Sequence, residues 1–206
     1  MRRIETTDLG GEYVILYIWG DDHCRSIMRS RHAATHRVWD DQNGYLFHGN
    51  FWANVEMDLG SGQFVERDSM LPTPASLYQM CDADFMVEAL THDLMVMLYG
   101  MERFNVDGDI GKLDRLAEIL GVEGIGTTDT DTRMARVGAL KMAYGFAASR
   151  YIVSAADRFV RDQGKQLLVC LLCPTATEQL LRAAPRYDQA FAGHLRDGGY
   201  RVFDMN

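Results

Sequence analysis

The sequence has few of the features that mark secreted, membrane-spanning or nucleic-acid-binding proteins. Cysteine is sparse and irregularly placed (Cys24, Cys81, Cys170 and Cys173), which favours reduced thiols over a disulfide framework. No apolar run approaches the roughly 18 residues of a membrane span. The Met-Arg-Arg start leads into acidic residues instead of the apolar core of a signal peptide. These absences predict a cytoplasmic protein without a membrane partner.

Basic residues are too few for a general nucleic-acid-binding protein. The chain has 21 Lys and Arg against 29 Asp and Glu, a net charge of -8, whereas affinity for phosphates depends on clustered positive charge. One basic cluster (Arg25, Arg29, Arg31 and Arg37) is offset by nearby acids (Asp21, Asp22, Asp40 and Asp41). With 206 residues, 47% of them hydrophobic, the chain can form one soluble domain with a sizeable core.

The apolar runs that are present are typical of a parallel sheet. Residues 13–19 form a continuous apolar run between Gly-Gly and Gly-Asp-Asp, which predicts a strand buried on both faces. A second fully buried strand is predicted at 166–174, and a third at 200–204. Helical spacing predicts one helix from Asp84 up to Asn105, and others over 113–120, from about 133 to Gly164, and over 175–183 and 186–196. This order of strands and helices predicts an α/β fold with a parallel sheet.

Between the first two strands lies a segment that we expect to be an insertion on a single domain, residues 1–206. Residues 54–59 and 63–68 alternate apolar and polar side chains on either side of Gly60-Ser-Gly62. This pattern predicts a β-hairpin with one half-exposed face. The hairpin and the helix that follows it make up the predicted insertion, residues 40–105.

A polar group directly follows the first predicted strand, where α/β proteins place ligand-binding residues. Gly20 can aim backbone N–H donors at a developing oxyanion, and Asp and His side chains can transfer protons. The candidate site residues are Gly20, Asp21, Asp22, His23 and Arg25. The alternative is that the same residues form only a solvated turn with a helix cap.

Three other motifs do not lead us to expect a metal or a cofactor. His32 and His36 share a helix face, but nearby arginines disfavour a bound cation. Cys170 and Cys173 have CxxC spacing inside a predicted strand, where residues three apart point to opposite faces; we expect both to be core cysteines. The 105–111 segment has alternating oxygen ligands, but Leu116 stands where a calcium loop needs glutamate.

The two ends of the chain resemble part of the SGNH (GDSL-type) hydrolase family. The segment VILYIWGDD, residues 14–22, resembles the strand that leads to the family's Gly-x-Asn-Asp-like motif. Gly20 stands near the motif's glycine, Asp21 replaces the asparagine of the oxyanion hole, and Asp22 keeps the aspartate. Residues 164–174 and 191–204 are similar to the late strand–helix–strand part of these enzymes.

The resemblance implies a three-layer α/β/α sandwich (SGNH/flavodoxin-like) with a hairpin and helical insertion, and hydrolysis of a small-molecule ester by a Ser-His-Asp triad. The family's Gly-Asp-Ser and Asp-x-x-His motifs do not occur in these 206 residues. We therefore expect a central fragment of a parent hydrolase, inactive as this chain alone. Gly20 would line the oxyanion side, and Asp22, His23 and Arg25 would shape substrate binding. A sheet without its first strand has an unpaired edge, which predicts a homo-oligomer.

A second hypothesis is a non-catalytic α/β binding or assembly module. Its partner surface would be the region from Trp39 to Met70, where Phe47, Phe51 and Trp52 supply aromatic side chains typical of interfaces. Burial of these aromatic residues against the sheet is the alternative to exposure.

Overall fold

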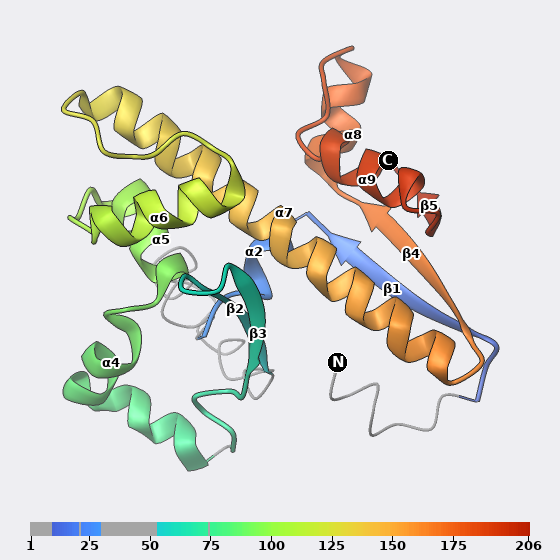
Figure 1. Ribbon diagram of the computed structural model, residues 1–206, viewed down its shortest axis with the longest axis horizontal. Helices are drawn as coiled ribbons and strands as arrows, with labels where there is room; N and C mark the ends of the chain where they lie inside the picture. Colours follow the sequence, from blue (N-terminus) through green and yellow to red (C-terminus); the bar gives the residue numbers. More distant parts are fainter. Residues whose placement is uncertain (1–9, 21, 30–52, 74) are drawn as a thin grey trace. The chain divides into compact units, whose positions relative to one another are not determined.

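The computed structural model describes residues 10–20, 22–29, 53–73 and 75–206 (Figure 1). The chain divides into two compact units. Unit 1 comprises Met1–His23 and Phe146–Asn206, and unit 2 comprises Cys24–Gly145. The long helix α7 (Thr130–Asp162) contributes its first half to unit 2 and its second half to unit 1.

Unit 1 contains the predicted parallel sheet. Its strands are β1 (Tyr13–Trp19), β4 (Gln166–Leu172) and β5 (Arg201–Asp204), in the order β1-β4-β5. Both pairings are parallel, with Tyr13 opposite Gln166 and Leu168 opposite Arg201. The three strands therefore end at the same edge of the sheet. The predicted α/β fold with a parallel sheet is confirmed.

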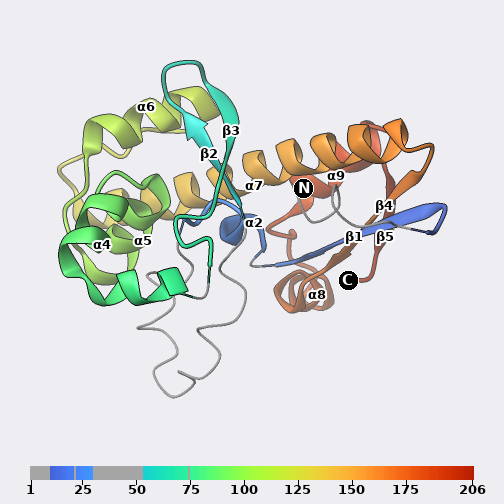
Figure 2. The same cartoon turned by 90° about the horizontal axis from the view of Figure 1, so that it is seen from below.

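One face of this sheet carries the core of unit 1. The second half of α7 and helix α9 (Gln189–Asp197) pack on it, and helix α8 (Pro174–Leu181) lies on the other side (Figure 2). Helices on both sides are compatible with the expected three-layer arrangement. The buried residues of this core are Val14, Ile18, Val153, Ala156, Val160, Leu167, Val169, Leu171, Phe191, Ala192 and Leu195.

Among the described residues, the other face of β1 is open, so the prediction of a strand buried on both faces was wrong. Tyr13, Ile15, Tyr17 and Trp19 are 38–63% exposed, whereas Val14 and Ile18 are buried. Because a continuous apolar run contains no polar residues, its pattern does not show which face of the strand is exposed to solvent. Phe203 on β5 is also more than half exposed. The open face thus carries aromatic and aliphatic side chains together with Arg201 of β5, whose guanidinium lies 5.8 Å from the centroid of the Tyr13 ring.

Unit 2 contains the predicted hairpin and a set of helices. Strands β2 (Asn54–Asp58) and β3 (Gln63–Arg67) pair antiparallel, which confirms the hairpin. The Met57 N–H donates to the Tyr144 hydroxyl at 3.1 Å, and the Phe64 ring stacks on the Tyr144 ring. Burial raises the pKa of the Tyr144 hydroxyl. The short helices α2 (Asp22–Arg25) and η2 (Ala75–Cys81) flank this region in the sequence.

The single helix predicted from Asp84 is in fact two, α4 (Ala83–Leu90) and α5 (Leu94–Phe104). Asp93 separates them because its carboxylate accepts hydrogen bonds from the N–H groups of Met95 and Val96 and so caps the start of α5. Apolar residues at helical spacing continue across this break, and for that reason periodicity alone suggested one helix. The predicted helix at 113–120 is α6 (Ile110–Leu120).

The loop between α6 and α7 is hydrogen-bonded to the carboxylate of Asp114. Asp114 accepts hydrogen bonds from the N–H groups of Ile125 (2.6 Å) and Gly126 (3.1 Å). A Cβ at Gly124 or Gly126 would lie 2.8 Å from a carboxylate oxygen of Asp114, so a side chain at either position would displace this carboxylate.

We expect Asp114→Ala to lower the free energy of unfolding by about 1–3 kcal/mol, because two backbone N–H groups lose their acceptor. Urea unfolding at neutral pH measures this difference. Asp107→Ala, at an exposed position, is the matched control and should stay within about 0.5 kcal/mol of the parent. Equal stabilities of the two variants would contradict the role of Asp114.

Candidate functional site

The candidate site lies at the carboxyl ends of the three parallel strands of unit 1. Gly20 follows β1, Cys173 follows β4, and Asn206 lies two residues after β5. In open parallel sheets, ligands bind at this edge. The candidate site therefore occupies the edge that general principles assign to ligand binding.

Gly20 is closely surrounded by residues from the other elements of unit 1. A Cβ built at Gly20 would lie 2.3 Å from the Cys173 sulfur and 3.1 Å from the Tyr187 hydroxyl. Any side chain at this position would displace these neighbours, so the turn after β1 needs glycine for steric reasons. The structure thus brings Gly20 together with Cys173, at the end of a second strand where the sequence also places ligand binding, and with Tyr187, which the sequence did not single out for this site.

Asp22 stabilises the end of β1. Its carboxylate accepts a hydrogen bond from the Trp19 N–H at 2.8 Å, and it is the first residue of α2, where a negative charge is favourable. Asp21 lies outside the described residues. Arg25 is the last residue of α2 and belongs to unit 2, whereas Gly20, Asp22 and His23 belong to unit 1.

His23 lies in the core of unit 1. Its side chain is 2% exposed, and its Nδ1 is 2.7 Å from the hydroxyl oxygen of Ser149 on α7. The rings of Phe146 and Phe191 meet the imidazole edge-on, with centroids 4.7 and 4.9 Å away. Burial lowers the pKa of His23 to about 4, and the carboxylates of Asp188 and Asp22 only partly oppose this shift. The ring is therefore neutral at pH 7.

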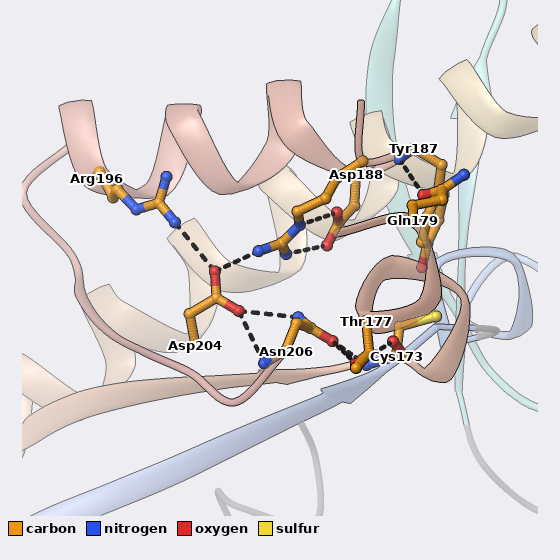
Figure 3. Close-up of polar contacts among 9 residues, drawn as sticks. Cys173, Thr177, Gln179, Tyr187, Asp188, Arg196, Asp204 and Asn206 are labelled. Atoms are coloured by element: carbon orange, nitrogen blue, oxygen red, sulfur yellow. Dashed lines mark hydrogen bonds and ion pairs between the residues drawn. The ribbon is translucent and has the colours of Figure 1, made fainter. Parts of the chain in front are cut away.

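A charged cluster connects the loop before α9 to the end of β5. The Arg186 guanidinium binds Asp188 through two hydrogen bonds, of 2.8 and 2.7 Å, and binds Asp204 through a third, of 2.6 Å. Arg196 also donates to Asp204, at 3.0 Å (Figure 3). The hydrogen bonds to Asp188 raise the pKa of Arg186. We call these four residues the Arg186 cluster.

Asn206 connects the ends of β4 and β5. Its side-chain oxygen accepts a hydrogen bond from the Cys173 N–H at 2.6 Å, and its amide donates to Asp204 at 2.8 Å (Figure 3). Burial alone would raise the pKa of Asp204, but the hydrogen bonds from Arg186 and Asn206 outweigh it and lower the pKa. Asp204 is thus held as a carboxylate by the groups around it.

The Arg186 cluster positions the chain segment that carries Tyr187. Tyr187 lies between the two residues of the Arg186–Asp188 pair, and its N–H donates to the side chain of Gln179 at 2.8 Å. The positive and negative charges of the cluster balance, so we assign the cluster a structural role. The sequence signals were the Arg-x-Asp before a helix and the Asp at a strand end, but only the fold brings them together.

The other sequence candidates are placed as follows. Cys170 and Cys173 are both buried and free, as expected of core cysteines. His32, His36, Phe47, Phe51 and Trp52 lie outside the described residues. Within the part of the chain that the structure describes, no group of three or more His, Cys, Asp or Glu side chains is arranged to hold a metal ion. Among the same residues, no helix is both long and apolar enough to cross a membrane.

Comparisons with known proteins found no matching family model, no matching curated protein and no matching solved structure. The function therefore has to be argued from the residues and their geometry.

Proposed function

We propose that this chain is part of an SGNH-like serine hydrolase that acts on a small-molecule ester, and that the chain is not active alone. The observation that supports the proposal best is the tight glycine turn at the carboxyl end of β1. Gly20 packs directly against Cys173 and Tyr187 there, at the edge where a parallel sheet binds its ligand. In this proposal the edge is one wall of the substrate site.

Three of the candidate residues have distinct roles in this proposal. Gly20 lines the oxyanion side, where its backbone N–H would donate to a substrate oxygen. Asp22 holds the end of β1 through the Trp19 N–H. His23 packs between Phe146 and Phe191, and this packing stabilises the segment that follows Gly20.

The His23–Ser149 hydrogen bond resembles the contact between a base and a nucleophile, but its surroundings argue for a structural role. Both side chains are buried, with Ser149 5% exposed, so substrate has no direct access to the hydroxyl. A histidine with a pKa of about 4 is also a weak base at pH 7. We therefore assign neither the nucleophile nor the general base of the hydrolase to this pair.

A hydrolysis assay with p-nitrophenyl acetate tests these assignments. We expect the chain to release p-nitrophenol no faster than buffer does, and Ser149→Ala and Asp22→Asn to behave identically. Turnover that Ser149→Ala abolishes would assign the catalysis to the buried pair and contradict its structural role. Turnover that survives both Asp22→Asn and His23→Phe would contradict the assignment of the site to this edge.

We also expect two sequence motifs of the hydrolase family in the gene that encodes this chain. A Gly-Asp-Ser block encoded upstream and an Asp-x-x-His block encoded downstream, in the same reading frame, would supply the nucleophile and the base. In-frame flanking sequence with neither block would contradict the proposed hydrolase.

A further inference from the structure

The backbone of β1 has one edge that faces β4 and one that faces away from it. The Glu12 C=O accepts a hydrogen bond from the Gln166 N–H at 3.0 Å, so Glu12 is directed toward β4. Backbone groups alternate in direction along a strand, and the N–H and C=O of one residue point the same way. Val14, Leu16 and Ile18 are therefore also directed toward β4. Tyr13, Ile15, Tyr17 and Trp19 are directed toward the outer edge.

This outer edge is not paired with another strand in the described part of the chain, because β1 is the first strand in the order β1-β4-β5. The Trp19 N–H is an exception, since it donates to Asp22. That hydrogen bond agrees with the alternation and marks the end of the accessible edge. The same four residues also direct their side chains to the open face of the sheet.

The edge lacks the devices that normally protect a strand from pairing. Exposed edge strands usually carry lysine, proline or a bulge, whereas β1 contains no charged residue, no proline and no glycine. Short uncharged segments rich in β-branched and aromatic residues pair readily with copies of themselves. Aromatic side chains cover roughly 150–250 Å² each. Those of Tyr13, Tyr17, Trp19 and Phe203, 38–56% exposed, leave on the order of 400 Å² open.

We propose that β1 pairs antiparallel with β1 of a second copy of this chain, around a two-fold axis at Leu16. The two three-stranded sheets then form one six-stranded sheet. In this register Ile15 lies opposite Tyr17 of the second copy, and Tyr13 lies opposite Trp19. In this register every residue of 13–19 lies opposite a residue of the same strand in the second copy.

The hydrogen bonds and side chains fit this register. Tyr13, Ile15 and Tyr17 offer both backbone groups at the edge, and Trp19 offers its C=O while its N–H stays bound to Asp22. Each cross-strand pair on the open face joins an aromatic ring to another aromatic or a β-branched side chain, and such pairs stabilise antiparallel strands. Because each copy has a net charge of -8, the copies repel one another at low salt, and added salt strengthens the association.

Light scattering after size-exclusion chromatography tests the pairing. We expect the full chain to be a dimer in 0.5 M salt, and Ile15→Lys to shift it to a monomer with an unchanged circular dichroism spectrum. Leu181→Lys, at a position 84% exposed on α8, is the matched control and should remain dimeric. A parent chain that is monomeric at 100 μM would overturn the proposal. So would a dimer that Ile15→Lys leaves intact.

Disulfide trapping tests the register. Directly opposed, hydrogen-bonded residues have Cα atoms about 5.5 Å apart, within the range that a disulfide spans. In a Cys81→Ser background, the pair Ile15→Cys and Tyr17→Cys should give a covalent dimer on oxidation, because each new cysteine meets the other across the axis. The control pair Tyr13→Cys and Tyr17→Cys should not. Equal cross-linking of the two double variants would overturn the proposed register.

Discussion

Acidification from pH 7 to pH 4 is expected to remove about 3 kcal/mol from the free energy of unfolding through His23 alone. The pKa of this histidine falls from an ordinary 6.5 to about 4 in the folded protein, because the buried imidazole cannot be solvated when charged. Between these two pH values the unfolded chain binds more protons than the folded chain, so stability rises with pH. The contribution is complete above about pH 6.5 and is lost as the pH falls toward 4.

The double variant His23→Phe/Ser149→Ala isolates this effect. Phenylalanine keeps an aromatic ring between Phe146 and Phe191, and the alanine avoids an unpaired buried hydroxyl. Urea unfolding at half-unit pH steps should show a shallower decline between pH 6.5 and 4 for this variant than for the parent. His194→Gln removes an exposed histidine from unit 1 and should keep the steeper decline. Identical pH profiles for the parent and the double variant would contradict a buried, neutral His23.

Removal of the Arg186 guanidinium is expected to produce the largest loss of stability at the carboxyl edge. The side chains of Arg186 and Asp188 are only 10% and 4% exposed, so Arg186→Leu leaves the Asp188 carboxylate buried without its cation. Breaking a buried ion pair on one side typically costs about 3–5 kcal/mol. Urea unfolding at pH 7 measures the loss.

Two further variants separate the buried pair from an ordinary surface pair. Arg182→Leu breaks the exposed ion pair with Glu178 and should change stability by less than about 1 kcal/mol. Arg186→Leu/Asp188→Leu removes both buried charges and should recover a large part of the loss. Arg186→Leu and Arg182→Leu variants of equal stability would show that the Arg186 cluster does not support the edge.

Local sequence pattern predicted the elements of this fold well, because apolar runs and helical periodicity report directly on burial. The strands at 13–19 and 166–172 and the hairpin at 54–67 follow from such patterns. The break at Asp93 did not, because one capping carboxylate outweighed a continuing apolar period. The open face of β1 was also missed, since it depends on which elements pack on the sheet and not on the strand itself.

The candidate site was only partly predictable for the same reason. Gly20 and Asp22 are local features at a strand end, and the sequence located both. The burial of His23 depends on Ser149 and Phe191, which are far away in the sequence and were not connected to it. The Arg186 cluster likewise forms only because the parallel connection from β4 to β5 brings α9 and the end of β5 together.

The central claim, that the carboxyl edge of the sheet binds an ester, is tested most directly by titrating ethyl butyrate into ¹⁵N-labelled protein and following the amide signals. The signals of Gly20, Cys173 and Tyr187 should shift together. Gly20→Ala should abolish the shifts, because its Cβ would collide with the Cys173 sulfur. Gly193→Ala, whose Cβ would meet nothing within 4 Å, should leave them unchanged. Amide shifts that avoid these three residues, or that survive Gly20→Ala unaltered, would contradict the claim.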